Sequence, residues 1–525
     1  MSVRNGKEWP QGWCWTYLED VSTLISGNPA PQGMKNFDPG GVPFVRVQDM
    51  GRLGSQVRLT DTKDHLAKSV TQRLQLFPAG AVLFTKSGAS TLLNQRAILH
   101  QPMYVVSHIA AAIPEDGVLS EWLYFWLSRI DFAHYAHATT LPSLPLSKAK
   151  KIEIPIASTA EQARITETLD ELFSNLDTGI AALSRARDGL KRYRSSVLKA
   201  AVEGTLTADW RARHPNVEPA SELLKRILAE RRRRWQEEQL RKFEDRGVKP
   251  PKNWQARYKE PAEPDTTGMP RLPETWSWAT MDQLTSKLMN GFGKRSQAEG
   301  SPCIVLRLAD VFEGEISYNN VRRINCTDDQ VRKYGVNEND LLILRVNGSA
   351  DLVGRFVLVK SAHKKILFCD HFIRAQCVSA EMAAWLRIYA DGGRFRSHVD
   401  HNKVSSAGQN TINQSTLLPF SIPLPPKAEQ KVIAETIEDH CSVIDHLKSE
   451  LDAKMNAARE LRQSILSGAF SGRLIPQDPN DEPASELLKR IAAERKAGSR
   501  EAADAKRGGR RAGDGTRRRR HSRRH

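Results

Sequence analysis

The side chains best suited to binding chemistry lie in short loops that combine Arg, Lys, Asn or Gln with Gly or Ser. Such side chains hydrogen-bond to base edges and phosphates, and glycine allows close approach of the backbone. The loops therefore predict contacts with nucleic acid, and an ordinary polar loop is the alternative for any single residue. The candidate contacts are Arg46, Lys86, Ser87, Asn94, Gln95, Arg96, Asn290, Lys294, Arg295, Arg345, Asn347 and Ser349.

Known catalytic motifs are missing from the sequence. The segment Gly291–Lys294 lacks the spacing of a GxxxxGK[ST] phosphate loop, and there is no dinucleotide fingerprint or HExxH motif. We also find no acidic cluster typical of a metal-dependent nuclease and no Asn-Pro-Pro-aromatic or Asp-Pro-Pro-aromatic tetrapeptide typical of amino-methyltransferases. The six cysteines form no CxxC pair, so we expect reduced thiols, no metal and no cofactor. The chain is expected to be non-catalytic.

Composition and charge indicate a globular protein with a modest basic excess. Hydrophobic residues make up 40% and charged residues 26% of the chain, and the net charge is +17. Residues 495–525 account for +10, residues 1–150 for +3 and residues 270–420 for +4. No apolar run approaches the roughly eighteen residues of a membrane span, and the N-terminus has no apolar signal core. We therefore expect a cytoplasmic protein, and a solvated face is sufficient to explain a basic excess of this size.

The chain contains an internal duplication of domain size. Ten residues, EPASELLKRI, occur without change at 218–227 and 482–491. The matching extends to Trp13-Cys14-Trp15 against Trp276-Ser277-Trp278 and to 154–206 against 422–474. Between these anchors the two halves diverge, which indicates that a common frame was copied and its contents changed.

Each copied segment contains a heptad pattern that predicts a helix of about 43 residues. Two such helices in one chain should pair with each other, because globular helices are usually far shorter. The predicted seam residues are Ile165, Leu169, Leu176, Leu183, Leu190, Val197, Ile433, Ile437, Ile444, Leu451 and Ile465. The interleaved row is predicted to be Leu172, Gly179, Ala186 and Tyr193 in one helix, and His440, Leu447, Lys454 and Leu461 in the other.

Other segments predict mixed α/β units and one further helix. Strands are expected at 44–47, 81–84, 104–109, 304–308, 341–344, 355–359 and 372–378, with aromatic helices at 120–135 and 381–389. The ten-residue repeat should begin a helix capped by Ser221 or Ser485. After this helix, prolines between 250 and 273 indicate a linker, and the Arg-rich C-terminus should be disordered.

Taken together, these motifs resemble the specificity subunit of type I restriction-modification systems. The resemblance rests on W-x-W at the start of each half and on the IP...EQ...I junctions that begin at Ile154 and Ile422. It also rests on the helix ends at 198–206 and 466–474 and on EPASELL, and it covers about residues 10–495. The Arg-rich tail is not part of the family pattern.

The resemblance implies an α/β fold with two globular target recognition domains separated by two long helices. These helices would pair as an antiparallel coiled coil with internal pseudo-twofold symmetry, followed by a disordered basic tail. The implied divisions are recognition domain 1–153, coiled-coil helix 154–206, helical extension and Pro-rich linker 207–269, recognition domain 270–421, coiled-coil helix 422–474, repeated helical segment 475–495 and tail 496–525.

The resemblance also implies the partners. Each recognition domain would bind one half of a split site in double-stranded DNA, and divergence of the domains predicts an asymmetric site. The helices would space the two halves and dock two methyltransferase subunits, which recruit restriction subunits, so that adenine methylation and cleavage reside in partners. Homo-oligomers and membrane contacts are not expected. The alternatives are a DNA-binding protein with a cryptic nuclease or methyltransferase activity, and a coiled-coil scaffold that binds only proteins.

Overall fold

The computed structural model describes residues 2–4, 7–54, 56–135, 142–312, 314–361, 365–498 and 500. Contacts divide the chain into two compact units. Unit 1 comprises Met1–Ser184 with Asp452–His525, and unit 2 comprises Arg185–Leu451. Unit 1 therefore combines the two ends of the chain, and unit 2 is its middle part. Each unit contains one end of each long helix.

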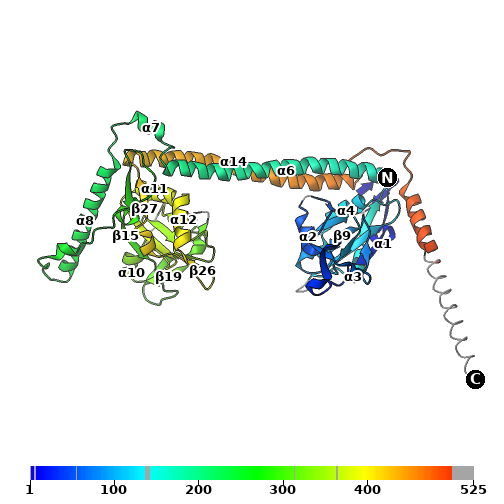
Figure 1. Ribbon diagram of the computed structural model, residues 1–525, viewed down its shortest axis with the longest axis horizontal. Coiled ribbons are helices and arrows are strands. Elements are labelled where there is room, and N and C mark those ends of the chain that lie inside the picture. The colour runs from blue at the N-terminus through cyan, green and yellow to red at the C-terminus, as the bar shows by residue number, and fades with distance from the viewer. Residues whose placement is uncertain are drawn as a thin grey trace, which may run out of the picture. The chain divides into compact units, whose positions relative to one another are not determined.

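Unit 1 contains two stacked sheets and short helices (Figure 1). The five-stranded sheet has the order β4 (Ser22–Ser26), β12 (Ile109–Pro114), β9 (Val82–Thr85), β10 (Arg96–Leu99) and β6 (Arg58–Leu59). The four-stranded sheet has the order β7 (Asp64–Leu66), β5 (Phe37–Val45), β11 (Met103–Val105) and β8 (Leu76–Phe77). Smaller ladders join β3 (Cys14–Tyr17) to β13 (Glu153–Ile156) and β1 (Ser2–Arg4) to β2 (Lys7–Trp9). The helices are α1 (Leu18–Val21), α2 (Val47–Arg52), α3 (Lys68–Thr71), α4 (Ser120–Arg129) and α5 (Leu146–Lys150), with 3-10 turns at Met34–Asn36, Ala89–Leu93 and Phe132–His134.

The five-stranded sheet of unit 1 is buried on both faces, which explains the continuous apolar runs in its sequence. Successive side chains of a strand point to opposite faces. Val82 and Phe84 accordingly join the core under α4, whereas Leu83 packs between the two sheets. The run Ile109–Ala112 divides in the same way.

The strand predicted at 104–109 is wrong, because the structure breaks it into two. β11 ends at Val105, and β12 begins at Ile109, whose amide donates to the Val106 carbonyl at 2.9 Å. Ser107-His108 forms the turn between them, so β11 and β12 belong to different sheets. The periodic pattern alone does not locate such a turn.

Unit 2 repeats this frame. Its four-stranded sheet has the order β15 (Thr285–Asn290), β24 (Phe372–Cys377), β20 (Leu341–Leu344) and β22 (Phe356–Leu358), and a three-stranded sheet has the order β19 (Arg323–Cys326), β16 (Ser301–Leu306) and β23 (Ile366–Phe368). Smaller ladders pair β14 (Ser277–Thr280) with β27 (Ser421–Leu424), β17 (Val311–Phe312) with β18 (Glu315–Ile316), and β21 (Val346–Asn347) with β26 (Gln409–Thr411) and β25 (Val404–Ser406). The helices are α7 (Ala208–Arg213), α8 (Ala220–Asp245), α9 (Met281–Leu284), α10 (Asp328–Tyr334), α11 (Ala380–Ala390), α12 (Gly393–Asn402) and α13 (Gln414–Leu417), with 3-10 turns at Trp254–Arg257 and Leu308–Asp310.

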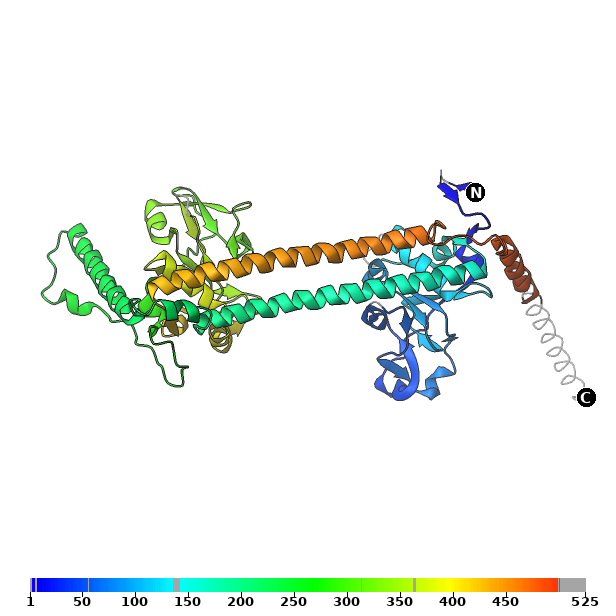
Figure 2. The ribbon, with the colours of Figure 1, turned by 90° about the horizontal axis from the view of Figure 1, so that it is seen from above.

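The two long helices are α6 (Thr159–Val202), of 44 residues, and α14 (Lys427–Ala469), of 43 residues. They run side by side in opposite directions (Figures 1 and 2). In unit 1, Arg462 Nη1 donates to Asp177 Oδ1 at 2.8 Å. In unit 2, Arg194 Nη1 donates to Asp445 Oδ1 at 3.2 Å. The predicted antiparallel pair is therefore confirmed.

The predicted interleaved row of the seam is correct only in part. Two of its members, Tyr193 of α6 and His440 of α14, contact each other across the helices, with Tyr193 Oη 3.2 Å from His440 Nδ1. The main row of each helix is less exposed than its neighbours, but on α14 the predicted companions Leu447 and Leu461 are 39% and 50% exposed. The buried companions instead follow the main row by four residues, as Phe173 and Met455 do. In an α-helix, residue i+4 lies about 40° around the axis from i and residue i+3 about 60° in the other direction. The i+4 side chain therefore stays closer to the partner helix.

The two copies of the ten-residue repeat pack in different units. Its first copy begins α8 and packs in unit 2, where the Ala220 amide donates to the Thr275 carbonyl at 2.9 Å. Its second copy is helical from 484 and packs in unit 1, where the Ala484 amide donates to the Gly12 carbonyl at 2.9 Å. The predicted Ser221 cap is wrong, since Pro219 occupies the cap position. A backbone carbonyl from another segment satisfies the first helical amide, so no serine cap is needed there.

The second helical segment continues to residue 498. The rest of the predicted disordered tail lies outside the described residues, except for Arg500, which is also assigned to a helix.

A buried glutamate joins the sheets to the long helix in each unit. Glu161 Oε2 accepts from Trp13 Nε1 at 2.9 Å, and Glu429 Oε2 accepts from Trp276 Nε1 at 2.8 Å. The W-x-W and E-Q motifs are therefore the two sides of one contact. Glu429 is completely buried, and Glu161 is 4% exposed. Burial raises the pKa of the Glu161 carboxyl.

We predict that Glu429→Ala lowers the free energy of unfolding by about 3–5 kcal/mol, the usual cost of removing one partner from a buried ion pair. The reason is that Glu429 also accepts from Thr207 Oγ1 at 2.6 Å and forms an ion pair with Arg211. Urea denaturation monitored by circular dichroism measures the change in the free energy of unfolding. The exposed Glu460 is the control, and equal stability of Glu460→Ala and Glu429→Ala would contradict this assignment.

Candidate nucleic-acid interface

Lys86 and Arg345 occupy equivalent positions in the two copies of the fold. The Lys86 amide donates to the His108 carbonyl at 2.9 Å, and the Arg345 amide donates to the His371 carbonyl at 2.8 Å. The Lys86 carbonyl in turn accepts from the Leu144 amide at 2.7 Å, and the Arg345 carbonyl accepts from the Ile412 amide at 3.0 Å. Both side chains are half-buried. The duplicated frame thus holds one cation at the same strand end in each unit.

The Gly- and Ser-containing loops follow these two cations. In unit 1, Ser87 Oγ lies 2.8 Å from His108 Nδ1, and a 3-10 turn at Ala89–Leu93 follows it. In unit 2, Asn347 Oδ1 accepts from the Ser349 amide at 2.8 Å and shapes the turn. The predicted loop residues Lys86, Ser87, Arg345, Asn347 and Ser349 are therefore grouped around one strand end in each unit.

Three further candidates of unit 2 lie at the end of β15 or in the loop after it. Asn290 ends β15, and its Oδ1 accepts from Gln414 Nε2 at 2.9 Å. In the following loop, Lys294 Nζ donates to Gln297 Oε1 at 2.9 Å, and Arg295 is exposed. Gln414 begins the short helix after the β25–β26 hairpin. This contact brings Asn290 close to the segment beside Asn347.

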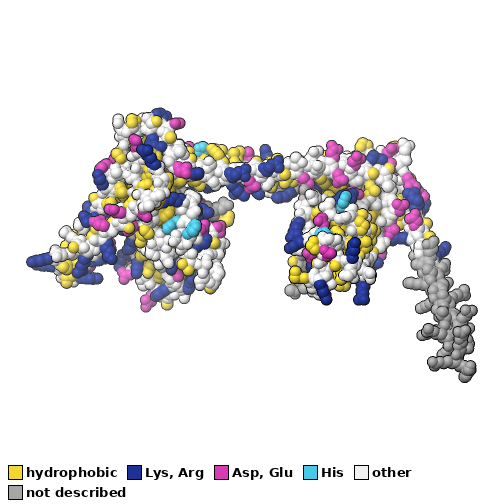
Figure 3. All heavy atoms as spheres, viewed as in Figure 1, with side chains coloured by type: hydrophobic (Ala, Val, Ile, Leu, Met, Phe, Trp, Pro, Cys, Tyr) yellow, Lys and Arg dark blue, Asp and Glu magenta, His cyan; other side chains and the backbone are white. Residues whose placement is uncertain are grey.

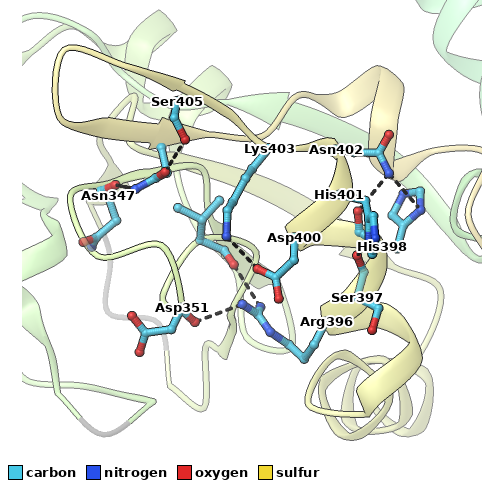
Figure 4. Close-up of polar contacts among 12 residues, drawn as sticks. Asn347, Asp351, Arg396, Ser397, His398, Asp400, His401, Asn402, Lys403 and Ser405 are labelled. Carbon is cyan, nitrogen blue, oxygen red and sulfur yellow. Dashed lines mark hydrogen bonds and ion pairs between the residues drawn. The ribbon is translucent and has the colours of Figure 1, made fainter.

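The sequence analysis missed the hairpin of β25 and β26. Ala407 and Gly408 form its two-residue turn with φ of 47° and 75°, as hairpin turns require. Ser405 Oγ donates to Asn410 Oδ1 at 2.6 Å, and Asn410 Nδ2 donates to the Gly348 carbonyl at 3.0 Å (Figure 4). The segment Ser-Ser-Ala-Gly-Gln-Asn has the same composition as the predicted loops, so that signal could have identified it.

Hydrogen bonds join α12, the helix before the hairpin, to the loop after Asn347. Arg396 of α12 donates to the carbonyls of Val353 and Asp351, each at 2.9 Å. At the end of α12, Lys403 Nζ donates to Asp400 Oδ1 at 2.7 Å (Figure 4). These contacts position the exposed hairpin relative to the Asn347 turn.

Arg46 has a structural environment. Its guanidinium forms an ion pair with Asp64 and lies 5.5 Å from the ring centres of Phe37 and Phe44. Its backbone amide donates to Asp49 Oδ2 at 2.8 Å. The side chain still keeps part of its surface exposed, so a phosphate contact stays a prediction.

Arg96 is interior and is not available to DNA in this structure, which contradicts its prediction as a contact. It is 6% exposed, and its guanidinium lies 3.8 Å from the centre of the Phe132 ring. It donates to the Gln95 carbonyl at 2.8 Å and to Asn94 Oδ1 at 3.3 Å. Burial lowers the pKa of Arg96 to about 9. At this position the predicted polar loop therefore contributes to the packing of the interior.

Asn94 and Gln95 also serve the packing of this loop. Asn94 adopts φ 49° and accepts the Phe132 amide at 3.1 Å, which holds the turn after α4. Gln95 Oε1 is buried, with no hydrogen-bond partner among the residues described. A loop rich in Asn, Gln and Arg can thus point inward as well as outward, and sequence composition does not distinguish the two.

The predicted docking residues on α6 and α14 lie along the seam. Ile165, Leu169, Val197, Ile433, Ile437 and Ile444 are buried, and Leu176, Leu183, Leu190, Leu451 and Ile465 are half-buried. Other apolar side chains of the helices remain exposed. These are Tyr193 (48%), Val443 (59%), Leu447 (39%) and Leu461 (50%).

The surface carries mixed charge. On the face shown in Figure 3, basic and acidic side chains are interspersed over both units. Within the described ranges, no three His, Cys, Asp or Glu side chains are grouped to hold a metal ion, and no helix is long and apolar enough to cross a membrane. All six cysteines are free thiols.

The fold and these loops define a two-unit binding protein of the α/β class whose polar loops are held on a duplicated frame. Residues 10–183 and 395–456 match the family model described as the type I restriction modification DNA specificity domain. The chain is 27% identical over 503 residues to the type I restriction enzyme StySPI specificity subunit of Salmonella potsdam, covering 93% of this chain and 96% of that one. It is 24% identical to the EcoKI specificity subunit of Escherichia coli K12, with the same coverage.

A solved structure has the same fold. A chain of a type I R-M system aligns with a TM-score of 0.60 and 16% identity, covering 89% of this chain and 100% of that chain. Over almost its whole length the chain is similar to type I restriction enzyme specificity subunits.

We predict that Arg96→Ala lowers the free energy of unfolding by about 2 kcal/mol or more, because a desolvated cation–π contact and its hydrogen bonds are lost. Thermal denaturation measures the change. The exposed Arg295 supplies the control variant, Arg295→Ala, for which we expect stability within about 0.5 kcal/mol of wild type. A stable Arg96→Ala protein with weakened DNA binding would restore Arg96 as a contact.

Proposed function

We propose that the two α/β regions, residues 1–153 and 270–421, are target recognition domains that each bind one half of an asymmetric, bipartite site in double-stranded DNA. The observation that carries this proposal is the equivalence of Lys86 and Arg345 on a shared backbone frame. The same hydrogen bonds hold both cations, while the loops after them differ in length and sequence. A common frame with different side chains supports contacts to different bases in the two half-sites.

We further propose that each domain contacts DNA through the loops at this strand end. In domain 1 the contacts come from Lys86 and Ser87, with Arg46 on a phosphate. In domain 2 they come from Arg345, Asn347, Ser349, Asn290, Lys294 and Arg295, together with the hairpin at 404–411. The modest charge of each domain supports weak binding by the free subunit.

We also propose that the long helices and their repeated extensions bind two methyltransferase subunits and, through them, restriction subunits. The proposed docking divisions are 154–206, 422–474 and 475–495, with 207–269 as helical extension and linker. Exposed apolar side chains on α6 and α14, such as Tyr193 and Val443, support a protein interface, since isolated apolar groups gain from burial against a partner. The complex would act in the cytoplasm with one copy of this chain.

The recognition of a split site is tested by mapping methylated adenines in the DNA of a host that expresses this chain with its methyltransferase subunit. We expect two different short motifs separated by a fixed number of unspecified bases, with adenine modified on both strands. A palindrome, or one continuous motif, would contradict the proposal.

Exchange of one domain tests the assignment of half-sites. When residues 276–420 are replaced by the corresponding segment of a relative, we expect one half of the methylated motif to change while the other half and the spacing stay the same. The matched control replaces residues 13–150 and should change only the other half. A change in both halves after either exchange would show that the two domains do not act separately.

Substitution of the equivalent cations tests the contact residues. We expect Arg345→Ala to weaken binding of the assembled complex to its site by about 1–3 kcal/mol, the usual value of a specific base contact. Lys86→Ala should act in the same way on the other half-site. Titration of labelled duplexes with either half randomised measures each effect. Uniform weakening across all sequences would instead place these cations on phosphates.

A further inference from the structure

Unit 2 contains a cavity of about 620 Å³ at the end of α6. Apolar side chains line most of it: Leu198, Val202, Leu272, Trp278, Tyr389 and Pro423. Its volume is in the range of ligand and anchor pockets in proteins. Sites of this kind are preferred positions for a single large side chain of a partner.

The corresponding place in unit 1 is filled by four aromatic rings in contact. The centres of Trp9 and Trp15 are 4.8 Å apart, those of Trp15 and Trp126 are 5.6 Å apart, and those of Trp126 and Phe470 are 5.1 Å apart. The guanidinium of Arg129 covers two of these rings, 5.0 Å from Trp126 and 5.4 Å from Phe470. Edge-to-face packing of this kind fills space and stabilises the cluster.

Equivalent backbone contacts show that the two places correspond. A side chain added at Gly472 would meet Pro10 in unit 1, and one added at Gly204 would meet Pro273 in unit 2. The Trp122 indole donates to the Pro155 carbonyl and the Trp385 indole to the Pro423 carbonyl, both at 2.9 Å. Residues at the same sequence distance from these anchors correspond in the two units. Every counterpart in unit 2 except Trp278 is smaller than the unit 1 residue. Leu272 stands for Trp9, Trp278 for Trp15, Tyr389 for Trp126, Val202 for Phe470 and Gly392 for Arg129.

The open cavity of unit 2 keeps a polar group as well. The guanidinium of Arg394 lies 5.1 Å from the centre of the Trp278 ring and 5.9 Å from that of Phe420. Its Nη1 atom is buried and has no hydrogen-bond partner among the residues that the structure describes.

We propose that this cavity receives an aromatic side chain from one of the two methyltransferase subunits. The occupant is argued from unit 1, where the chain's own Trp9 and Phe470 fill the same frame. The proposal rests on the proposed function, since it names a contact of a partner proposed there. Because the cavity exists in unit 2 alone of the two equivalent places, the two methyltransferase subunits bind with unequal affinity.

The test fills the cavity with the side chains that unit 1 uses. The double variant Leu272→Trp, Val202→Phe transfers Trp9 and Phe470 to their equivalent positions, so that the fold should be kept and the thermal midpoint should not fall. Titration of the full-length chain with methyltransferase subunit, followed by native mass spectrometry and calorimetry, separates the two binding steps. We expect one step to weaken at least tenfold and the other to stay unchanged. Leu76→Trp on the exposed side of β8, outside the proposed docking segments, is the control for the added indole and should change neither step.

Two outcomes distinguish this proposal from the function on which it rests. If the double variant folds and binds both subunits as the wild type does, the cavity proposal is overturned and the partner assignment stands. If the wild-type chain binds no methyltransferase subunit, the partner assignment falls and the cavity proposal falls with it. Should the double variant lose its fold, Val202→Phe alone makes the smaller part of the same change, and an unchanged second binding step then overturns the proposal.

Discussion

The buried contact between a tryptophan indole and a glutamate at the start of each long helix is the constraint on which the rest of the structure depends. Trp13 and Trp276 stand directly before the strands β3 and β14, and Glu161 and Glu429 lie in the first turn of the helices α6 and α14. A carboxylate removed from water requires hydrogen-bond donors, so this pair allows little variation in the angle between strand and helix. The neighbouring glutamine adds to the restraint, because Gln162 donates to the Ala157 carbonyl at 3.0 Å and Gln430 to the Pro425 carbonyl at 2.8 Å. Together these groups fix the direction in which α6 and α14 leave their sheets.

That restraint explains why the frame was kept while the loops diverged. The frame residues are buried and hydrogen-bonded, so a change in one of them leaves another polar group unpaired. The loops after Lys86 and Arg345 carry side chains toward solvent or toward each other, so a change there affects fewer buried contacts than a change in the frame. Under the proposed function, new loop side chains would contact new bases while the frame stays the same.

The duplication did not keep the two units equal in packing. The aromatic cluster around Trp126 and the open cavity beside Tyr389 occupy the same place in the shared frame. Removing large side chains from a packed cluster costs several kcal/mol unless the space is refilled. Trp278 keeps the place of Trp15 beside this open cavity, as expected if a partner completes the site in the assembled complex.

The sequence by itself determined the duplication, the length and pairing of the two long helices, the buried tryptophans and the family. These features depend on local periodicity and on motifs that lie on one element, and both are visible in a linear pattern. Only the tertiary structure decided that Arg96 packs against Phe132, that residues four apart line the helix seam, and that the hairpin at Ala407-Gly408 lies beside Asn347. It also decided that the first copy of EPASELLKRI packs in unit 2 and the second copy in unit 1. The physical reason is that exposure of a polar side chain, and the occupant of a helix face, are set by neighbours that are distant along the chain.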